Sequence, residues 1–318
     1  MSLHWLKLDE KRLSQQWIFR LAIAIPFTIS FFLCIPLWFD TTFDFSSAGY
    51  TKFLSMFSLP IGVLSLSIPL VAIVAHIHRT IQTEKQIELI NQKNTSDKFY
   101  AHYKYITDSF SSIKSSNINL NGKEVIIEIS NVNSLYRDFF PNSSPENGTV
   151  IEQKSVHTIK IFKSLNEIDK ELHELEYERS DNSDPNLVLF NILNEIISLS
   201  SNLSIDIHKI IPSENTRKLL FMKNDKKFKM ITCFLDEAEL KNYLKCIYVI
   251  NITIMDLLDI KFDYYPSLSN YALSNKKYHF KSSFDVMKKT NEPYHSFDIG
   301  DGAFTSEEFD DFNSYFTQ

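Results

Sequence analysis

The sequence predicts an α+β chain that is mainly helical: an N-terminal two-helix transmembrane hairpin followed by a cytoplasmic helical domain with small antiparallel β-hairpins. Three observations predict this class. Two uncharged apolar runs lie before residue 80. Only 6 of the 318 residues are glycine, which favours helices over glycine-rich loops. Farther along, apolar residues recur at helical spacing and short β-branched runs flank turn residues.

The first apolar run is Leu21–Phe39, with Trp17 and Trp38 near its two ends. Tryptophan is common where a transmembrane helix meets the lipid headgroups. Pro26 and Pro36 lie inside the run and predict kinks or a frayed end. The run is too long for the apolar region of a cleaved signal peptide, so we expect a membrane-spanning helix.

The second apolar run, Phe53–Ala75, contains no charged residue. A bilayer core of about 30 Å is crossed by roughly 20 apolar residues in a helix. Neither glycine nor proline occurs between Val71 and Asn91. We therefore expect the helix to leave the membrane and continue into water as a rod that ends near Gln92.

The charges around the two runs predict their orientation. Asp40–Lys52 is expected to be a short polar loop with two acidic residues and one lysine. Basic residues instead lie before the first run and after the second: Lys7, Lys11, Arg12, Arg20, Arg79 and Lys85. By the positive-inside rule, both termini are expected in the cytoplasm and the loop on the other side of the membrane.

Small or weakly polar residues form a stripe on the second run. Their spacings of three and four residues place them on one helix face: Gly62, Ser65, Pro69, Ala72 and His76. Such a face serves close packing within the hairpin, or it serves assembly between chains or the lining of a pore. His76, His78 and Arg79 are expected to reach lipid headgroups, because histidines two residues apart on a helix point in different directions and make a poor metal site.

The remaining elements follow from periodicity and turn residues. Asn94–Asp97 is expected to break the rod, and Asn121-Gly122 and Asn224-Asp225 to be hairpin turns. The expected helices are Phe99–Lys114, Asn131–Phe140, Val150–Arg179, Asn186–Ile211 and Ala238–Ile260. We divide the chain into 1–79 (membrane hairpin, helices about 17–39 and 53–77), 80–140 (exit helix and connecting segment), 141–296 (helical domain with a β-hairpin) and 297–318 (acidic-aromatic tail).

Motifs for enzyme chemistry are missing from the sequence. It contains no phosphate-binding loop, no metalloprotease helix motif and no nucleophile elbow. The three cysteines have neither metal-ligand nor redox spacing, which favours a reducing compartment. After Arg79 lie 27 basic and 35 acidic residues, a net charge of −8, so binding of nucleic acid over the whole surface is not expected. We expect neither an enzyme, nor a cofactor, nor a small-molecule substrate.

Two segments are candidate contact sites. The first is the basic hairpin, which we expect either to contact phosphates or anionic lipid or to be a solvated tip; its cations are Arg217, Lys218, Lys223, Lys226, Lys227 and Lys229. The second is the tail, where aromatic residues alternate with acidic ones; Phe304, Phe309, Phe312 and Phe316 are expected either to dock on a basic partner or to pack on their own domain.

The membrane-exit segment also resembles a known family. The residues that carry the resemblance are Leu59-Pro60-Ile61-Gly62, Ser67-Ile68-Pro69-Leu70, His76-Ile77-His78-Arg79, Gln82-Thr83, Gln86-Ile87 and Phe99-Tyr100-Ala101-His102. In this order they resemble two-transmembrane-helix effectors of retron anti-phage systems, over residues 1 to about 140. Those systems pair a toxic protein with a reverse transcriptase and its RNA–DNA hybrid.

The resemblance implies a toxin of the bacterial inner membrane that acts in abortive infection and that its reverse transcriptase and RNA–DNA hybrid hold inactive. Once released, its hairpins would either rearrange or assemble as a homo-oligomer, and so disrupt the membrane. It supplies no catalytic residues. A membrane-tethered scaffold or sensor without toxicity is the alternative, and an enzyme with an unrecognised site is a third, lesser one.

Overall fold

The computed structural model describes residues 9, 11–39, 41–152, 155–177, 184–206, 216–223, 226–274 and 277–292. The chain divides into two compact units, residues 1–95 and 96–318. Most of it is helical, with small antiparallel sheets, as the sequence predicts. Two helical stretches, Trp17–Phe39 and Ser58–Ser112, are long and apolar enough to cross a membrane.

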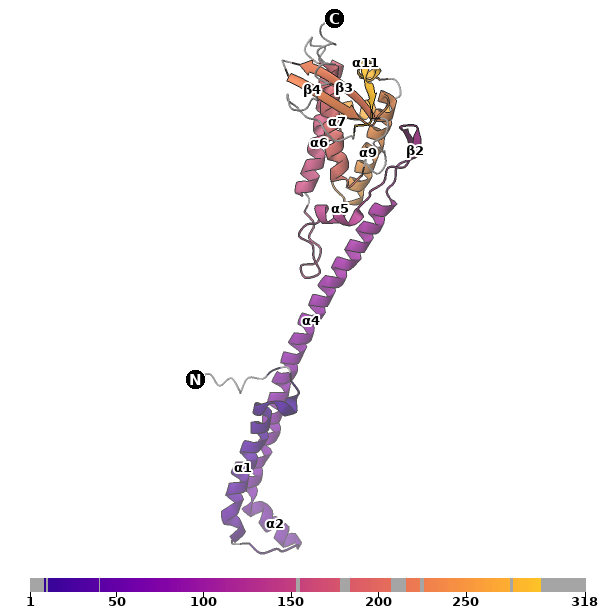
Figure 1. Ribbon diagram of the computed structural model, residues 1–318. Helices are drawn as coiled ribbons and strands as arrows, with labels where there is room; N and C mark the ends of the chain where they lie inside the picture. Colours follow the sequence, from indigo (N-terminus) through magenta and orange to yellow (C-terminus); the bar gives the residue numbers. More distant parts are fainter. Residues whose placement is uncertain are drawn as a thin grey trace. The chain divides into compact units, whose positions relative to one another are not determined.

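The first unit holds a short 3₁₀ turn, η2 (Leu13–Gln15), and then helix α1 (Trp17–Phe39). Helix α1 remains one helix although Pro26 and Pro36 lie inside it. Helices α2 (Ser47–Met56) and α3 (Ser58–Ser65) follow, and α3 packs against α1. Figure 1 labels α1, α2 and the long helix α4 (Ser67–Ser112) that begins after α3.

Prolines divide the second apolar run, which we expected to be a single helix. Pro60 and Pro69 each stand third in a new helix, α3 and α4. Proline lacks the N–H that would bond four residues back, so it ends a preceding helix, but within a first turn that N–H has no intrahelical partner to lose. The regular helical hydrogen bonding is therefore interrupted at Phe57 and at Leu66. At Leu66 the backbone stays helical, with φ of −63° and ψ of −20°, so Ser58–Ser112 forms one helical stretch.

The connection between α1 and α2 is shorter than the polar loop expected over Asp40–Lys52. Helix α2 already begins at Ser47, where the Ser46 hydroxyl accepts a hydrogen bond from Gly49 N at 3.1 Å. A β-carbon on Gly49 would lie 2.2 Å from the carbonyl oxygen of Asp44, so only glycine fits this turn. Phe43 and Phe45 are 98% and 79% exposed, which makes the connection aromatic as well as polar.

Helix α4 runs without interruption from Ser67 to Ser112. The break expected at Asn94–Asp97 is wrong. The hydroxyl of Thr95 donates to the carbonyl of Asn91 at 2.9 Å in its own helix, and that of Ser96 donates to Pro145 O at 2.7 Å. Polar residues such as these can cap a helix, but they do not by themselves end the one that precedes them. Neither glycine nor proline is present here to interrupt the helix.

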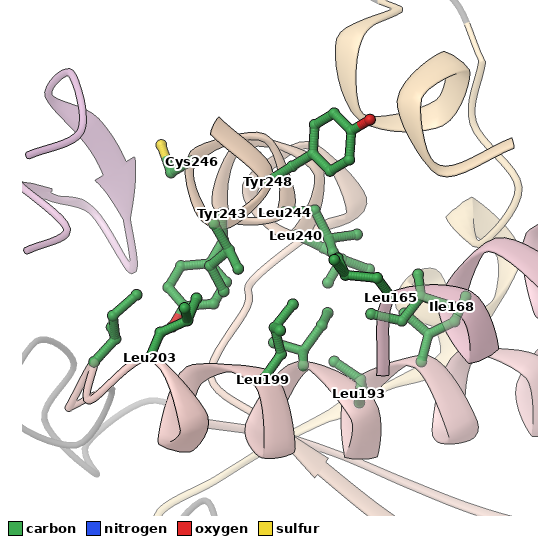
Figure 2. Close-up of a cluster of buried hydrophobic side chains, with 14 of the residues drawn as sticks. Leu165, Ile168, Leu193, Leu199, Leu203, Leu240, Tyr243, Leu244, Cys246 and Tyr248 are labelled. Carbon is green, nitrogen blue, oxygen red and sulfur yellow. The ribbon is translucent and has the colours of Figure 1, made fainter. Parts of the chain in front are cut away.

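The second unit is built around three helices: α6 (Val156–Tyr177), α7 (Pro185–Asn202) and α9 (Glu237–Leu257). Their apolar residues recur at three- and four-residue spacing and meet in one core, where each buried leucine or isoleucine contributes about 1.5–3 kcal/mol. Figure 2 shows Leu165 and Ile168 of α6, Leu193 and Leu199 of α7, and Leu240 and Leu244 of α9, all at most 2% exposed. Ile106 and Phe110 of α4 belong to the same core.

The helix ends have local causes. Helix α6 starts at Val156 rather than at Val150, because Val150 N is bonded to the Ser143 hydroxyl at 2.8 Å. Helices α7 and α9 end just before residues with positive φ, Ser204 and Asp259, both at 53°. Smaller helices complete the unit: α5 (Val132–Phe139), α10 (Pro266–Leu273) and α11 (Lys281–Val286).

Two small sheets have the expected hairpins. Strands β1 (Ile118–Leu120) and β2 (Lys123–Val125) join at Asn121-Gly122, whose φ values of 53° and 73° confirm the predicted turn. Strands β3 (Thr216–Lys223) and β4 (Lys226–Thr232) pair antiparallel, while the predicted turn residues 224–225 lie outside the described residues. An unpredicted strand, β5 (Lys288–Thr290), pairs with the other edge of β3.

Candidate functional site

Helix α1 packs against α3, where Pro60 is buried, and Phe57 just before α3 is buried as well. Farther along, Val74 and His78 of α4 are also buried. The hydroxyl of Ser30, itself 6% exposed, donates to the carbonyl oxygen of Pro60 at 2.8 Å. A polar group in an apolar helix pair needs such a partner, so this bond fixes the height at which the two helices meet.

The predicted small-residue stripe lies elsewhere on the run. All five residues are exposed: Gly62 and Ser65 in α3, and Pro69, Ala72 and His76 in α4. A β-carbon built on Gly62 would meet no atom within 4 Å. Packing within the hairpin therefore does not use this stripe. Its use for assembly between chains or for the lining of a pore stays a prediction.

His78 ties the N-terminal segment to α4. Its side chain is buried, and its Nε2 donates to the carbonyl oxygen of Lys11 at 2.7 Å. Gln16, 6% exposed, binds the same segment through the backbone of Asp9 and Lys11 and through the Asp9 carboxylate. The expectation that His78 reaches the headgroups is wrong; the exposed neighbours His76 and Arg79 remain as expected candidates.

The basic hairpin divides its charges between two faces of the sheet. Antiparallel partners share a face, and Arg217, Lys223 and Lys226 share theirs with the buried Leu219 and Phe221. The other three cations, Lys218, Lys227 and Lys229, lie on the opposite face. The six residues therefore do not form one continuous basic surface, although Lys223, Lys226 and Lys227 all lie at the same end of the two strands, the hairpin tip.

Glu292, just after β5, neutralises part of this charge. Its two carboxylate oxygens lie 2.9 Å from Lys218 Nζ and 2.6 Å from Lys229 Nζ. Partial burial favours a higher pKa for Glu292, but the hydrogen bonds from Lys229 and Lys218 outweigh it, so its pKa is lowered. A carboxylate with a lowered pKa stabilises the fold above its unfolded pKa, and that contribution is lost as the pH falls through the folded pKa.

A buried polar cluster joins α9 to α10 and to residues 277–280. Glu237, 3% exposed, accepts hydrogen bonds from the Tyr271 hydroxyl at 2.8 Å and from the backbone N–H groups of His279 and Phe280 at 2.6 and 2.9 Å. Lys241 donates to Ser274 O at 2.6 Å, and burial lowers its pKa. With three donors on one carboxylate, the cluster has the geometry of a structural anchor, and sequence periodicity gave no sign of it.

A cleft of about 1090 Å³ lies between α6 and the turn that follows α9. Ile159 and Tyr264 line it and are 55% and 71% exposed. Burial, together with Asp263 and Asp169, raises the pKa of Tyr265 to about 12, so this hydroxyl stays protonated at neutral pH. Within the described residues, no three histidine, cysteine, aspartate or glutamate side chains gather to hold a metal ion.

The predicted docking tail, with Phe304, Phe309, Phe312 and Phe316, lies outside the described residues. The candidate site of this chain is therefore the pair of apolar helical stretches with the exposed stripe, and the basic sheet of the second unit. Comparison with protein-family models, curated proteins and solved structures yields no match.

Bulk on the exposed stripe tests its role in assembly. Gly62→Leu adds a side chain where the chain itself leaves open space, so the hairpin should fold and insert as before. If chains meet at this stripe, chemical cross-linking between them should fall several-fold. Leu70→Phe, at a residue 42% exposed and not three or four residues from any member of the stripe, is the control. Equal cross-linking in the parent and both variants would make Gly62 a lipid-facing position.

Loss of the His78 contact should release the N-terminal segment. His78→Phe removes a hydrogen bond worth about 1 kcal/mol, so trypsin should cleave after Lys11 and Arg12 about fivefold faster. His76→Phe, two residues away and exposed, should leave the cleavage rate unchanged. Identical rates for the two variants would show that His78 does not hold the segment.

Proposed function

We propose that this chain is a membrane-inserted effector of a retron-like anti-phage defence system. A reverse transcriptase with its RNA–DNA product holds it inactive, and release lets it disrupt the inner membrane and cause abortive infection. Support comes from the resemblance of its membrane-exit segment to such effectors and from two helices long and apolar enough to span a bilayer. The chain acts on lipid rather than on a small-molecule substrate, without a cofactor and without enzyme chemistry.

In this proposal, α1 and the α3–α4 run cross the inner membrane and both termini lie in the cytoplasm. Basic residues lie before the first apolar run and after the second, and the positive-inside rule places such residues on the cytoplasmic side. The connection at residues 41–46 then lies outside, and its exposed Phe43 and Phe45 suit the headgroup layer.

The observation that carries the proposal is the continuity of α4. One helix begins in the apolar run at Ser67 and ends at Ser112, and its Ile106 and Phe110 are buried in the core of the second unit. A partner that binds the second unit thereby acts on an element that is also part of the membrane run. It can shift the equilibrium between silent and active states only by its differential affinity for them.

Assembly and inhibition use different surfaces in this account. The exposed stripe from Gly62 to His76 brings hairpins together as a homo-oligomer once the inhibitor leaves. The lysines at the hairpin tip, Lys223, Lys226 and Lys227, contact the phosphates of the RNA–DNA hybrid. Such contacts release counterions, so inhibitor binding weakens steeply with salt concentration.

Expression with and without the partner tests the function. The chain alone should stop growth and depolarise the inner membrane, and co-expression of the neighbouring reverse transcriptase with its RNA should restore growth. Changing Lys223, Lys226 and Lys227 to Glu should weaken partner binding, because phosphates would then meet carboxylates, and leave the chain toxic beside its partner.

The matched control changes three exposed lysines away from the hairpin, Lys104, Lys160 and Lys245, to Glu. It alters the net charge equally and should remain under control of the partner. A chain that is harmless without its partner would favour the membrane-tethered scaffold or sensor. Equal recovery of the partner by both triple variants in a salt series would remove the hairpin tip from the inhibitor contact.

A further inference from the structure

The face of the β4–β3–β5 sheet that turns away from the main core, termed the outer face, is rich in lysine. In antiparallel pairs, directly opposed residues lie on the same face. Lys218 is opposite Ile231 of β4 and Lys288 of β5, and Leu220 is opposite Lys229. The outer face therefore carries Lys218, Leu220, Lys227, Lys229, Ile231 and Lys288. Figure 1 shows β3 and β4 running side by side.

The centre of the outer face is buried, although it lies outside the main core. Ile231 and Lys229 are 1% and 8% exposed, and Ile231 is not part of the core formed by Leu219, Phe221 and the helices. Burying a lysine is unfavourable unless an anionic partner accompanies it. The outer face thus suits a covering segment that supplies both apolar and acidic side chains.

Glu292 shows how an acidic residue sits on this face. It bridges Lys218 and Lys229, which lie on neighbouring strands. Its backbone is held as well, since the Thr216 hydroxyl donates to Glu292 O at 2.8 Å. The chain therefore leaves the described residues at the outer face itself, already with one carboxylate bound between two lysines.

The sequence that follows matches this chemistry. Residues 293–318 contain six acidic and seven aromatic residues, with neither lysine nor arginine. At about 3.3 Å per residue, residues 293–318 can reach much farther than the width of three strands that lie about 4.8 Å apart. The segment is therefore long enough to cover the sheet. Attachment at Glu292 gives the segment a high effective concentration at the sheet, which a separate acidic partner lacks.

We propose that residues 293–318 dock on the outer face of their own chain, with their acidic side chains on its lysines and their aromatic rings on Leu220 and Met222. Met222 belongs to the same face and is 41% exposed. The segment then occupies Lys227, one of the cations proposed to contact the hybrid, and competes with phosphate for it. This competition rests on the proposed function, whereas the docking itself does not.

Site-specific photo-cross-linking of the full chain in nanodiscs tests the docking. A benzophenone amino acid at Phe309 or Phe312 should cross-link within the chain to residues 216–232 or 288–292. Cross-linking should fall several-fold at 1 M salt, where the screening length is about 3 Å. The same probe at Tyr264, 71% exposed and lining the cleft, should not reach the sheet. Cross-links to the cleft, to residues 1–95 or to a second chain would overturn the proposal.

A variant in which four acidic residues of the segment 293–318 are neutralised distinguishes docking of the segment on the sheet from its competition with phosphate. Glu307→Gln, Glu308→Gln, Asp310→Asn and Asp311→Asn should reduce cross-linking to the sheet several-fold. If the tail also competes with phosphate, this variant should bind a synthetic RNA–DNA hybrid several-fold more tightly. Cross-linking to the sheet without any hybrid binding would support the docking and contradict the proposed hybrid contact. Unchanged cross-linking in the neutral variant would overturn the acidic basis of the docking.

Discussion

A single helix is shared by the apolar run and by the core of the second unit, and the proposed inhibition depends on this constraint. From Val71 to Ser112 the sequence contains neither glycine nor proline, so every turn of α4 can keep its backbone hydrogen bonds. At one end, Val74 and His78 are buried in the first unit; at the other, Phe110 is fully buried in the second. Helix α4 therefore contributes buried residues to both units.

In the first unit, backbone hydrogen bonding is kept although prolines are present. Pro60 and Pro69 would each interrupt a helix, and the chain confines them to first turns, where the missing N–H is harmless. The Pro60 carbonyl oxygen also accepts a hydrogen bond from the hydroxyl of Ser30. These contacts fix which stripe of the run faces α1, and the stripe of Gly62 and Ala72 is left facing outward.

Local signals were predictable from the sequence, and long-range pairings were not. The turn at Asn121-Gly122 and the short helix expected at Asn131–Phe140 depend on neighbouring residues, and both are found, the helix as α5. The choice of the inward stripe depends on α1, and the His78–Lys11 contact joins residues 67 positions apart. Strand β5 is a polar tripeptide, Lys288–Thr290, that is a strand only because β3 offers it an edge. The Glu237 cluster has no local signal, because its partners Tyr271, His279 and Phe280 lie 34 to 43 residues away in the sequence.

The central claim is that the two apolar runs cross a membrane with residues 41–46 on one side and the second unit on the other. Labelling of single cysteines in intact cells, in a background free of Cys34, Cys233 and Cys246, tests it most directly. Phe43→Cys, at a 98% exposed position, should react with a membrane-impermeant maleimide in intact cells. Glu124→Cys, exposed on β2, should react only after the inner membrane is opened. Labelling of both positions, or of Glu124→Cys alone, in intact cells would contradict the account.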